Sequence, residues 1–226
     1  MDHEIRHRPS YALLDVTLES GESLMAEAGA MVSHTDGVEI STGRGGGSLL
    51  KSVKSSVLGG ESFFRNTFTA PEGGSVTLAP PLPGDIVHHE IEDERILVQS
   101  GAYLAADADI ELDSEFGGAT SFFGGEGLFL LELQGTGPTF FASYGAVERV
   151  ELDAGESYTV DTGHVVGFTD GVTWDVNRVG GLKSTLLSGE GLVCEFTGEG
   201  TVWLQTRSHD AFLAWLIPQL PTNNQN

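Results

Sequence analysis

The chain alternates short apolar runs with glycine-containing turns, and one arrangement of these runs occurs three times. Each occurrence opens with a Gly-Glu pair, and the pairs, spaced 65 and then 64 residues apart, are Gly60-Glu61, Gly125-Glu126 and Gly189-Glu190. An apolar run, a turn with glycine and a second apolar run follow each pair. The pattern predicts three hairpins, within residues 59–80, 124–145 and 188–208.

A second recurring stretch precedes each of these predicted hairpins. Residues 19–32, 92–105 and 153–166 align on the glycines Gly29, Gly101 and Gly163. The apolar positions before each glycine alternate imperfectly with polar ones, which indicates a strand that is half or fully buried. We expect the three glycines to adopt positive φ angles or to mark bulges where a strand bends toward another sheet.

The two recurring stretches divide the chain into three like segments, residues 11–83, 84–145 and 146–208. We therefore predict an all-β fold. Each segment is too short to bury its apolar face alone, so we expect the three to pack around a pseudo-threefold axis. They would form a single domain over residues 11–218.

Four parts of the chain do not repeat. Residues 42–58 contain an apolar spacing that fits either one face of a short amphipathic helix or an ordered loop. Residues 208–217 predict a C-terminal helix, with Ser208 as the N-cap and Pro218 beyond the last turn. We expect residues 1–10 to fray and residues 219–226 to be a disordered tail.

Several stretches resemble one known family. They are GGGSLLKSVKSSVLGGESFF, LAPPLPGDI, QSGAYLA, FFGGEGLFLLELQGTG and GEGLVCEFTGEGTVWLQTRS. These residues resemble the Altered Inheritance of Mitochondria protein 24 family over residues 11–218. The resemblance implies three tandem units similar to the tryptophan RNA-binding attenuation protein (TRAP), each a double-stranded β-helix or sandwich, around a pseudo-threefold axis. It implies no catalytic residues.

Fungal mitochondrial members of that family are tied to inner-membrane organisation, whereas prokaryotic members are mostly uncharacterised. The N-terminus, MDHEIRHRPS, does not resemble a mitochondrial transit peptide. The mitochondrial role is therefore not transferred to this chain. We expect a prokaryotic member.

The chain is strongly acidic, with 33 Asp and Glu against 11 Lys and Arg and a formal net charge of −22. This balance favours a solvated surface in a salt-rich cytoplasm, because high salt screens self-repulsion. The alternative is an acidic surface that binds a basic partner. Binding to a phosphate backbone needs clustered Lys and Arg, so nucleic acid is disfavoured as a partner.

Cysteine usage and hydropathy indicate an intracellular protein. The single cysteine, Cys194, lies in an apolar run and is expected to be a small core residue. No stretch approaches 18 uncharged apolar residues. We expect a soluble cytoplasmic protein without a transmembrane segment.

One repeated position carries the only candidate metal ligands, Glu61, Glu126 and Glu190. Near a pseudo-threefold axis the three carboxylates could converge on Ca²⁺ or Mg²⁺, which prefer oxygen ligands. The alternative is that each Glu stays within its own segment and accepts hydrogen bonds from turn amides. No cofactor is expected.

No catalytic motif is found in the sequence. Metal-binding spacings and a nucleophile elbow are absent, and the glycine-rich stretch 43–47 lacks the Gly-Lys-Ser/Thr ending of a phosphate loop. The adjacent His88 and His89 should point to opposite faces of a strand, so they cannot chelate as a pair. His164 replaces an alanine of the other segments and is expected at the surface. We expect a protein that is not an enzyme.

Two surfaces are candidates for interactions. The first is the one basic region of the chain, which also contains apolar residues: Arg44, Leu49, Leu50, Lys51, Lys54 and Arg65. It could bind an anion, an acidic partner or a membrane surface, or its apolar residues could cover one end of the β core. The second is the C-terminal helix, whose Phe212, Trp215 and Leu216 need a cover on this domain or in an oligomer.

The sequence therefore favours a non-catalytic scaffold or interaction protein that self-associates as a homo-oligomer or binds a protein partner. Peripheral membrane contact would involve residues 42–58. The alternative hypothesis is a module that binds a small ligand, an ion or an anion at the pseudo-threefold axis or between the repeats. A pocket with convergent polar groups would distinguish the two.

Overall fold

The structure is a computed structural model, and it describes residues 1–44, 64–113, 129–178 and 192–221. Strands dominate the described residues, and the single α-helix among them, α2 (His209–Leu216), is near the C-terminus. This confirms the all-β prediction. The strands are β1 (Asp2–Arg6), β2 (Leu13–Leu18), β3 (Ser23–Glu27), β4 (Met31–His34), β5 (Glu39–Arg44), β6 (Phe64–Thr69), β7 (Gly74–Leu78), β8 (Ile86–Gln99), β9 (Tyr103–Asp107), β10 (Glu111–Asp113), β11 (Leu130–Ala142), β12 (Val147–Leu152), β13 (Ser157–Asp161), β14 (Val165–Thr169), β15 (Val172–Arg178), β16 (Leu192–Gly198) and β17 (Gly200–Gln205).

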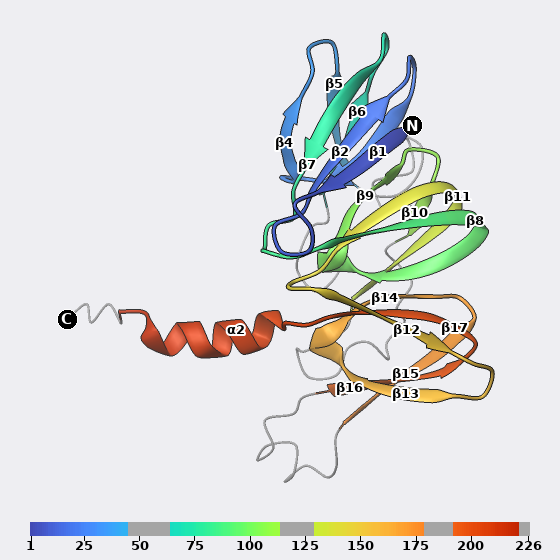
Figure 1. Cartoon of the computed structure of the whole chain (residues 1–226), viewed down its shortest axis with the longest axis vertical. Coiled ribbons are helices and arrows are strands. Elements are labelled where there is room, and N and C mark those ends of the chain that lie inside the picture. The colour runs from blue at the N-terminus through green and yellow to red at the C-terminus, as the bar shows by residue number, and fades with distance from the viewer. Residues whose placement is uncertain (45–63, 114–128, 179–191, 222–226) are drawn as a thin grey trace.

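The strands follow one another along the long axis of the molecule. Strands β1 to β7 lie at one end, β8 to β11 in the middle and β12 to β17 at the other end, while α2 projects to one side (Figure 1). A ten-stranded sheet runs through all three regions, in the order β12-β17-β14-β8-β11-β9-β3-β6-β5, with β10 beside β11. A four-stranded sheet, β1-β2-β7-β4, and a three-stranded sheet, β13-β16-β15, complete the two ends.

Each of the three sequence segments contributes the same two sets of paired strands. In residues 11–83 these are β2-β7-β4 and β3-β6-β5, and in residues 146–208 they are β12-β17-β14 and β13-β16-β15. In the middle segment β8 and β11 are long enough to take part in both sets, with β9 and β10 beside them. Neighbouring segments are joined by the pairs β3–β9 and β8–β14.

No strand of the first segment pairs with one of the third among the described residues, so the sheets connect the segments in series. A pseudo-threefold axis within one chain would require the two end segments to meet. The strand pairings therefore do not provide that closure.

The predicted hairpins are wrong. Strand β6 pairs with β3 and β5, whereas β7 pairs with β2 and β4, so the two runs enter different sheets. Strands β16 and β17 are likewise in different sheets, and the middle pair is one continuous strand, β11. Glycines with positive φ turn the backbone at these corners: Gly73 at +85°, Gly135 at +140°, Gly137 at +142°, Gly198 at +124° and Gly200 at +154°.

The prediction for the three aligned glycines is correct only in the first segment. Gly29 has a φ of +96°, but Gly101 and Gly163 lie in the one-turn 3₁₀-helices η1 (Ser100–Ala102) and η3 (Thr162–His164), without a positive φ. A 3₁₀ turn reverses the chain with ordinary backbone angles, so it needs no glycine conformation there.

Three hydrophobic clusters form the core, one for each end of the molecule and one for the middle. Strand β2 shows how the sequence produces them, because Leu14, Val16 and Leu18 alternate with more exposed residues and point into the first cluster. Cys194 is fully buried in the third cluster, as predicted.

The N-terminal residues, expected to fray, form β1 instead. Strand β1 pairs antiparallel with β2, from Asp2 opposite Thr17 to Arg6 opposite Leu13. The terminal ammonium of Met1 binds Glu22 Oε1 at 2.7 Å, and Met1 and Ile5 pack against the first cluster. The apolar side chains of this short polar stretch are therefore covered by the domain.

Candidate interaction surfaces

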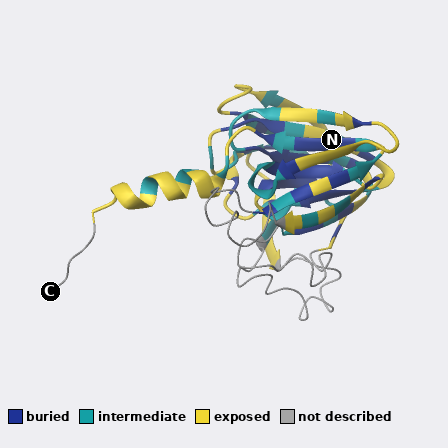
Figure 2. Ribbon diagram, turned by 90° about the horizontal axis from the view of Figure 1, so that it is seen from below, coloured by how far each residue is buried: buried dark blue, intermediate teal, exposed yellow. Residues whose placement is uncertain are grey.

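Helix α2 leaves the β body and exposes most of its apolar side chains. Ser208 caps it, since the Ala211 amide donates to Ser208 Oγ at 3.4 Å. Trp215 is 62% exposed and Leu213 45% exposed, and Ile217 in the following 3₁₀ turn η4 (Ile217–Gln219) is 60% exposed. Figure 2 shows that yellow, exposed positions run along the helix beyond its base.

Within the part of the chain that the structure describes, α2 makes ring contacts with the body only at its base. Phe212 lies edge-on to Tyr144, with ring centroids 6.1 Å apart, and His209 is tilted against the same tyrosine at 5.4 Å. Phe212 and Leu216 are half-buried, and no residue of the helix is fully buried. Among the described residues, the helix therefore has no groove that covers its apolar surface.

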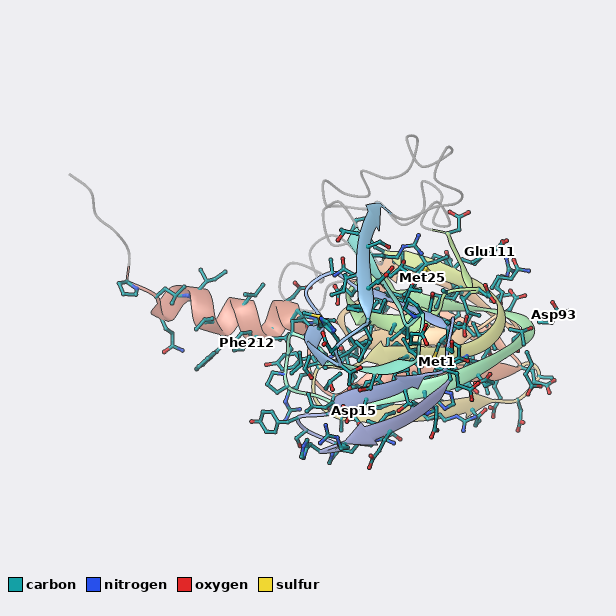
Figure 3. All side chains as sticks on the ribbon, turned by 90° about the horizontal axis from the view of Figure 1, so that it is seen from above. Met1, Asp15, Met25, Asp93, Glu111 and Phe212 are labelled. Carbon is teal, nitrogen blue, oxygen red and sulfur yellow. The ribbon has the colours of Figure 1, made fainter. Side chains whose placement is uncertain are left out.

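A partly buried polar cluster lies where β3, β6 and β9 meet. Arg65 is directly opposite Glu27 across the β3–β6 pair. Arg65 Nη1 lies 3.4 Å from Met25 Sδ, and the Tyr103 hydroxyl donates to the Met25 carbonyl at 3.4 Å (Figure 3 labels Met25). An acidic and a basic side chain, those of Glu27 and Arg65, thus lie half-buried beside the face of β3 opposite Leu24 and Ala26.

Burial sets the protonation of this cluster. It raises the pKa of Glu27 to about 7 and lowers the pKa of Arg65, because removal from water disfavours the charged form of each. The pKa of the buried Tyr103 hydroxyl is also raised, chiefly by burial. The cluster can therefore exchange a proton at Glu27 near neutral pH.

The histidines occupy separate environments. His88 lies against His3 and Phe140, with ring centroids 4.1 and 5.3 Å away, whereas His89 lies against Trp203 at 5.1 Å. The two adjacent side chains thus face opposite ways, as predicted. His164 is half-buried, and its Nδ1 lies 2.7 Å from the Gln205 carbonyl, so it is held by the domain rather than free at the surface.

Most of the predicted site residues lie outside the described residues: Glu61, Glu126, Glu190, Leu49, Leu50, Lys51 and Lys54. Arg44 ends β5, but its side chain is outside the described set as well. The metal hypothesis and the basic-apolar surface thus stay predictions. Within the described ranges, no three His, Cys, Asp or Glu side chains are close enough to hold a metal ion.

Two further observations concern Cys194 and the helices. Burial raises the pKa of the Cys194 thiol to about 12, so the thiol is neutral inside the third cluster. No helix among the described residues is long and apolar enough to cross a membrane.

Comparison with known proteins decides the family. The model of the family described as Mitochondrial biogenesis AIM24 matches residues 3–207. This chain belongs to that family. The match covers most of the chain and confirms the resemblance found from the glycine-rich stretches.

Proteins from Streptococcus pyogenes resemble this chain along nearly its whole length. An uncharacterised protein of serotype M6 is 31% identical over 221 residues, which cover 95% of this chain and 89% of the relative. A crystal structure of a Streptococcus pyogenes protein has a TM-score of 0.81 and 28% identity, and the match covers 97% of this chain and 99% of that one.

Sequence reasoning missed the Glu27, Arg65 and Tyr103 cluster, although Arg65 itself was a candidate. The strands that bring the three residues together come from two segments of the AIM24-family chain, and the pairing of β3 with β9 is not visible in a linear pattern. An acidic residue in an apolar run, as Glu27 is in LMAEA, was the available signal.

Proposed function

We propose that this AIM24-family protein is a non-catalytic scaffold composed of three tandem TRAP-like units. A β-bulge that occurs at the same position in each segment supports the division into three like units. Strands β4, β9 and β14 each contain one unpaired residue opposite the last strand of their segment, namely Val32, Leu104 and Val166. Each lies three positions after the aligned glycine of its segment. A bulge at one repeated position is expected of units that share a backbone.

The exposed apolar surface of α2 carries the scaffold proposal. A soluble domain seldom exposes neighbouring large apolar side chains without a partner for them. Leu213, Trp215 and Ile217 present such a surface beyond the contact of Phe212 with Tyr144. Leu213 and Ile217, four positions apart, and Trp215, three positions after Phe212, have the spacings with which an apolar helix enters a hydrophobic groove on a protein partner.

The net charge of the chain limits the classes of molecule that could be its partner. With a net charge of −22, a phosphate backbone or an anionic surface would be repelled. The partner we propose is therefore a protein with an apolar groove, bordered by neutral or basic residues. The same charge supports the proposal of a halophilic, cytoplasmic source, because high salt screens an acidic surface.

Affinity capture in buffer of molar salt tests the scaffold proposal. Wild-type protein should retain a reproducible partner that Trp215→Ser loses, because the indole supplies the largest exposed apolar group on α2. The matched control is Ala214→Ser, which places the same hydroxyl at the neighbouring exposed helix position. If the captured proteins are the same for wild type and Trp215→Ser, the helix is not the binding element and the proposal fails.

Arg65 is the observation in favour of the alternative, an anion-binding module. Its guanidinium is partly desolvated, and the described contact of its side chain is the Met25 sulfur rather than a carboxylate. Under this alternative, inorganic phosphate should raise the melting temperature of wild type but not of Arg65→Gln. The control is Arg149→Gln, whose side chain is largely exposed. Equal effects of phosphate on all three proteins would reject the alternative.

A further inference from the structure

Among the described residues, two strands are free edges although their counterparts are paired inside the molecule. Strand β4 corresponds to β9 and β14 when the segments are aligned on Gly29, Gly101 and Gly163. Strand β9 pairs with β3 of the preceding segment, and β14 pairs with β8 of the preceding segment. Among the described residues, by contrast, β4 pairs only with β7, and β13, the counterpart of β3, pairs only with β16.

We call the strand pairs that connect neighbouring segments, β3–β9 and β8–β14, the internal joints. Both have the same register. At the first joint Leu24 is opposite Asp107, and at the second Ile96 is opposite Thr169. In both, a residue five positions before one aligned glycine pairs with a residue six positions after the next. Applied to the free strands, this rule places Tyr158 opposite Thr35.

The free strands are exposed where their counterparts are buried. On β4, Met31 is 40% and Val32 54% exposed, whereas Tyr103 and Leu104 of β9 and Val165 and Val166 of β14 are buried. On β13, Tyr158 is 38% exposed, whereas its counterparts Leu24 and Ile96 are fully buried. Both strands therefore lack a cover that the internal joints possess.

Three other edges do not show this contrast. Strands β5, β10 and β15 occupy equivalent places, and each is an edge in its own segment. The exposure of these three edges is thus common to all three segments. Strand β12 is also an edge, but its counterpart β2 has β1, from outside the three segments, as its second partner. Among the described residues, only β4 and β13 are edges whose counterparts pair with a neighbouring segment.

We infer that β4 of one copy pairs antiparallel with β13 of a second copy, which joins copies head to tail. Tyr158 lies opposite Thr35, Thr159 opposite His34, and Val160 opposite Ser33 of the neighbour. The inference goes beyond the scaffold proposal and does not depend on it, because it rests on strand pairing alone. Two copies are needed because β4 and β13 lie at opposite ends of the long axis (Figure 1).

Side-chain packing supports the same joint. Leu104 enters the first cluster beside Leu24 and Ala26, and Val166 enters the second beside Ile96 and Val98. The equivalent residue of β4 is Val32, so it enters the third cluster of the neighbour beside Val160. Backbone hydrogen bonds along the edge give affinity, and the Val32 side chain gives register.

The amino-acid composition of β4 and β13 favours their pairing. Natural edge strands are commonly protected by charged residues or proline. Residues 31–35 contain neither, and β13 contains only Asp161, whose carboxylate already accepts from the Gly163 amide. His34 faces Thr159, so no two acidic side chains oppose each other within the three predicted pairs. A heterologous joint of this kind closes into a ring or extends into a filament, according to the rotation between copies.

Solution mass tests the joint. In molar salt, wild type should elute at a multiple of the 23.9 kDa chain mass, and Val32→Glu should elute as a monomer, because it buries a carboxylate at the joint. The control is Ile40→Glu on β5, which alters a 43% exposed residue on an edge that is free in every segment, and it should stay assembled. A wild-type monomer at high micromolar concentration would overturn the inference.

Disulfide trapping tests the register of the β4–β13 pair independently of the Val32→Glu variant. His34→Cys combined with Thr159→Cys should form an intermolecular disulfide on oxidation, because directly opposite residues have Cβ atoms within about 5.5 Å. Buried Cys194 should not interfere. The control pair, Thr42→Cys with Thr159→Cys, uses the β5 edge and should remain monomeric on a non-reducing gel. Equal crosslinking of both pairs would reject the register.

Discussion

At the scale of the residue, one backbone position shows how the repeat determines amino-acid choice. The turn that precedes β3 and β13 contains Gly21 with φ +85° and Gly155 with φ +86°, while Asp93 occupies the aligned position in β8 with φ +58°. Asp93 is the residue that β8 leaves unpaired opposite the Gly135–Thr136 step of β11. Left-handed backbone is favourable for glycine and costly for residues with a Cβ.

We predict that Asp93→Gly stabilises the protein and that Gly21→Ala destabilises it. The loss for Gly21→Ala should be about 1 kcal/mol and should come from the backbone alone, since an added Cβ at Gly21 meets no atom within 4 Å. The gain for Asp93→Gly should be about 0.5 kcal/mol, because aspartate tolerates this region better than alanine. Urea denaturation measures both, and a loss for Asp93→Gly would contradict the argument.

Glu27 gives a second prediction, which concerns pH. Its pKa in the folded protein is about 7, above the value near 4.5 expected when unfolded. The folded state therefore binds an extra proton between these values, so stability falls as pH rises from 4.5 to 7 and then stays constant. Glu27→Gln should be more stable than wild type by roughly 1–2 kcal/mol at pH 8, and the difference should vanish near pH 4.

Thermal melts over pH 4 to 8 measure the Glu27 effect. The control Glu39→Gln removes an exposed carboxylate on β5, so the same loss of charge is made without burial. If the two variants change stability in parallel across the pH range, desolvation of Glu27 is not the cause.

At the scale of the element, the corner glycines separate two structures that a linear pattern does not distinguish. Two apolar runs around a glycine turn occur in a hairpin and also where a chain crosses from one sheet to another. In β6 and β7 the runs cross, while in β11 the same pattern is one bent strand. The pairing partners, which come from distant parts of the chain, determine which structure forms.

We predict that the two terminal elements contribute unequally to stability. Deletion of residues 1–6 removes β1 and the Met1 and Ile5 contacts with the first cluster, so it should cost about 2–3 kcal/mol. Deletion of residues 208–226 removes α2, which has no fully buried residue, and should cost less than about 1 kcal/mol. Urea denaturation of both deletions makes the comparison. A larger loss for the C-terminal deletion would show that α2 packs on the domain.

At the scale of the whole molecule, the net charge affects both the stability of the fold and the pairing of β4 with β13 between copies. The 33 acidic side chains outnumber the 11 basic ones and leave a net charge of −22, so most carboxylates have no cation to pair with. Self-repulsion destabilises a compact acidic protein and also opposes the approach of copies. Salt should therefore favour both folding and the β4–β13 joint.

We predict that the melting temperature rises between 0.1 and 1 M KCl, as the Debye length falls from about 10 Å to about 3 Å. Calorimetry of wild type and of Val32→Glu separates the two contributions, because the variant retains the charge effect and lacks the joint. Sucrose at equal osmolality controls for general exclusion from the surface. A melting temperature that falls with KCl in both proteins would contradict the role of self-repulsion.

The sequence by itself determined what depends on local chemistry. Alternating apolar positions identified the all-β class, Ser208 and Pro218 delimited the terminal helix, and the apolar surroundings of Cys194 indicated burial. The ordered glycine motifs also indicated the family that the match over residues 3–207 shows. Each of these signals is contained within a few neighbouring residues or their spacing.

Only the tertiary structure decided which strands pair. The crossing of β6 and β7 into different sheets, the incorporation of β1 and the meeting of Glu27 with Arg65 all depend on partners far apart in the chain. The same holds for the contrast between β4 and its counterparts β9 and β14. A strand carries the same pattern whether its edge is covered or free, so exposure of that edge follows from what lies beside it in space.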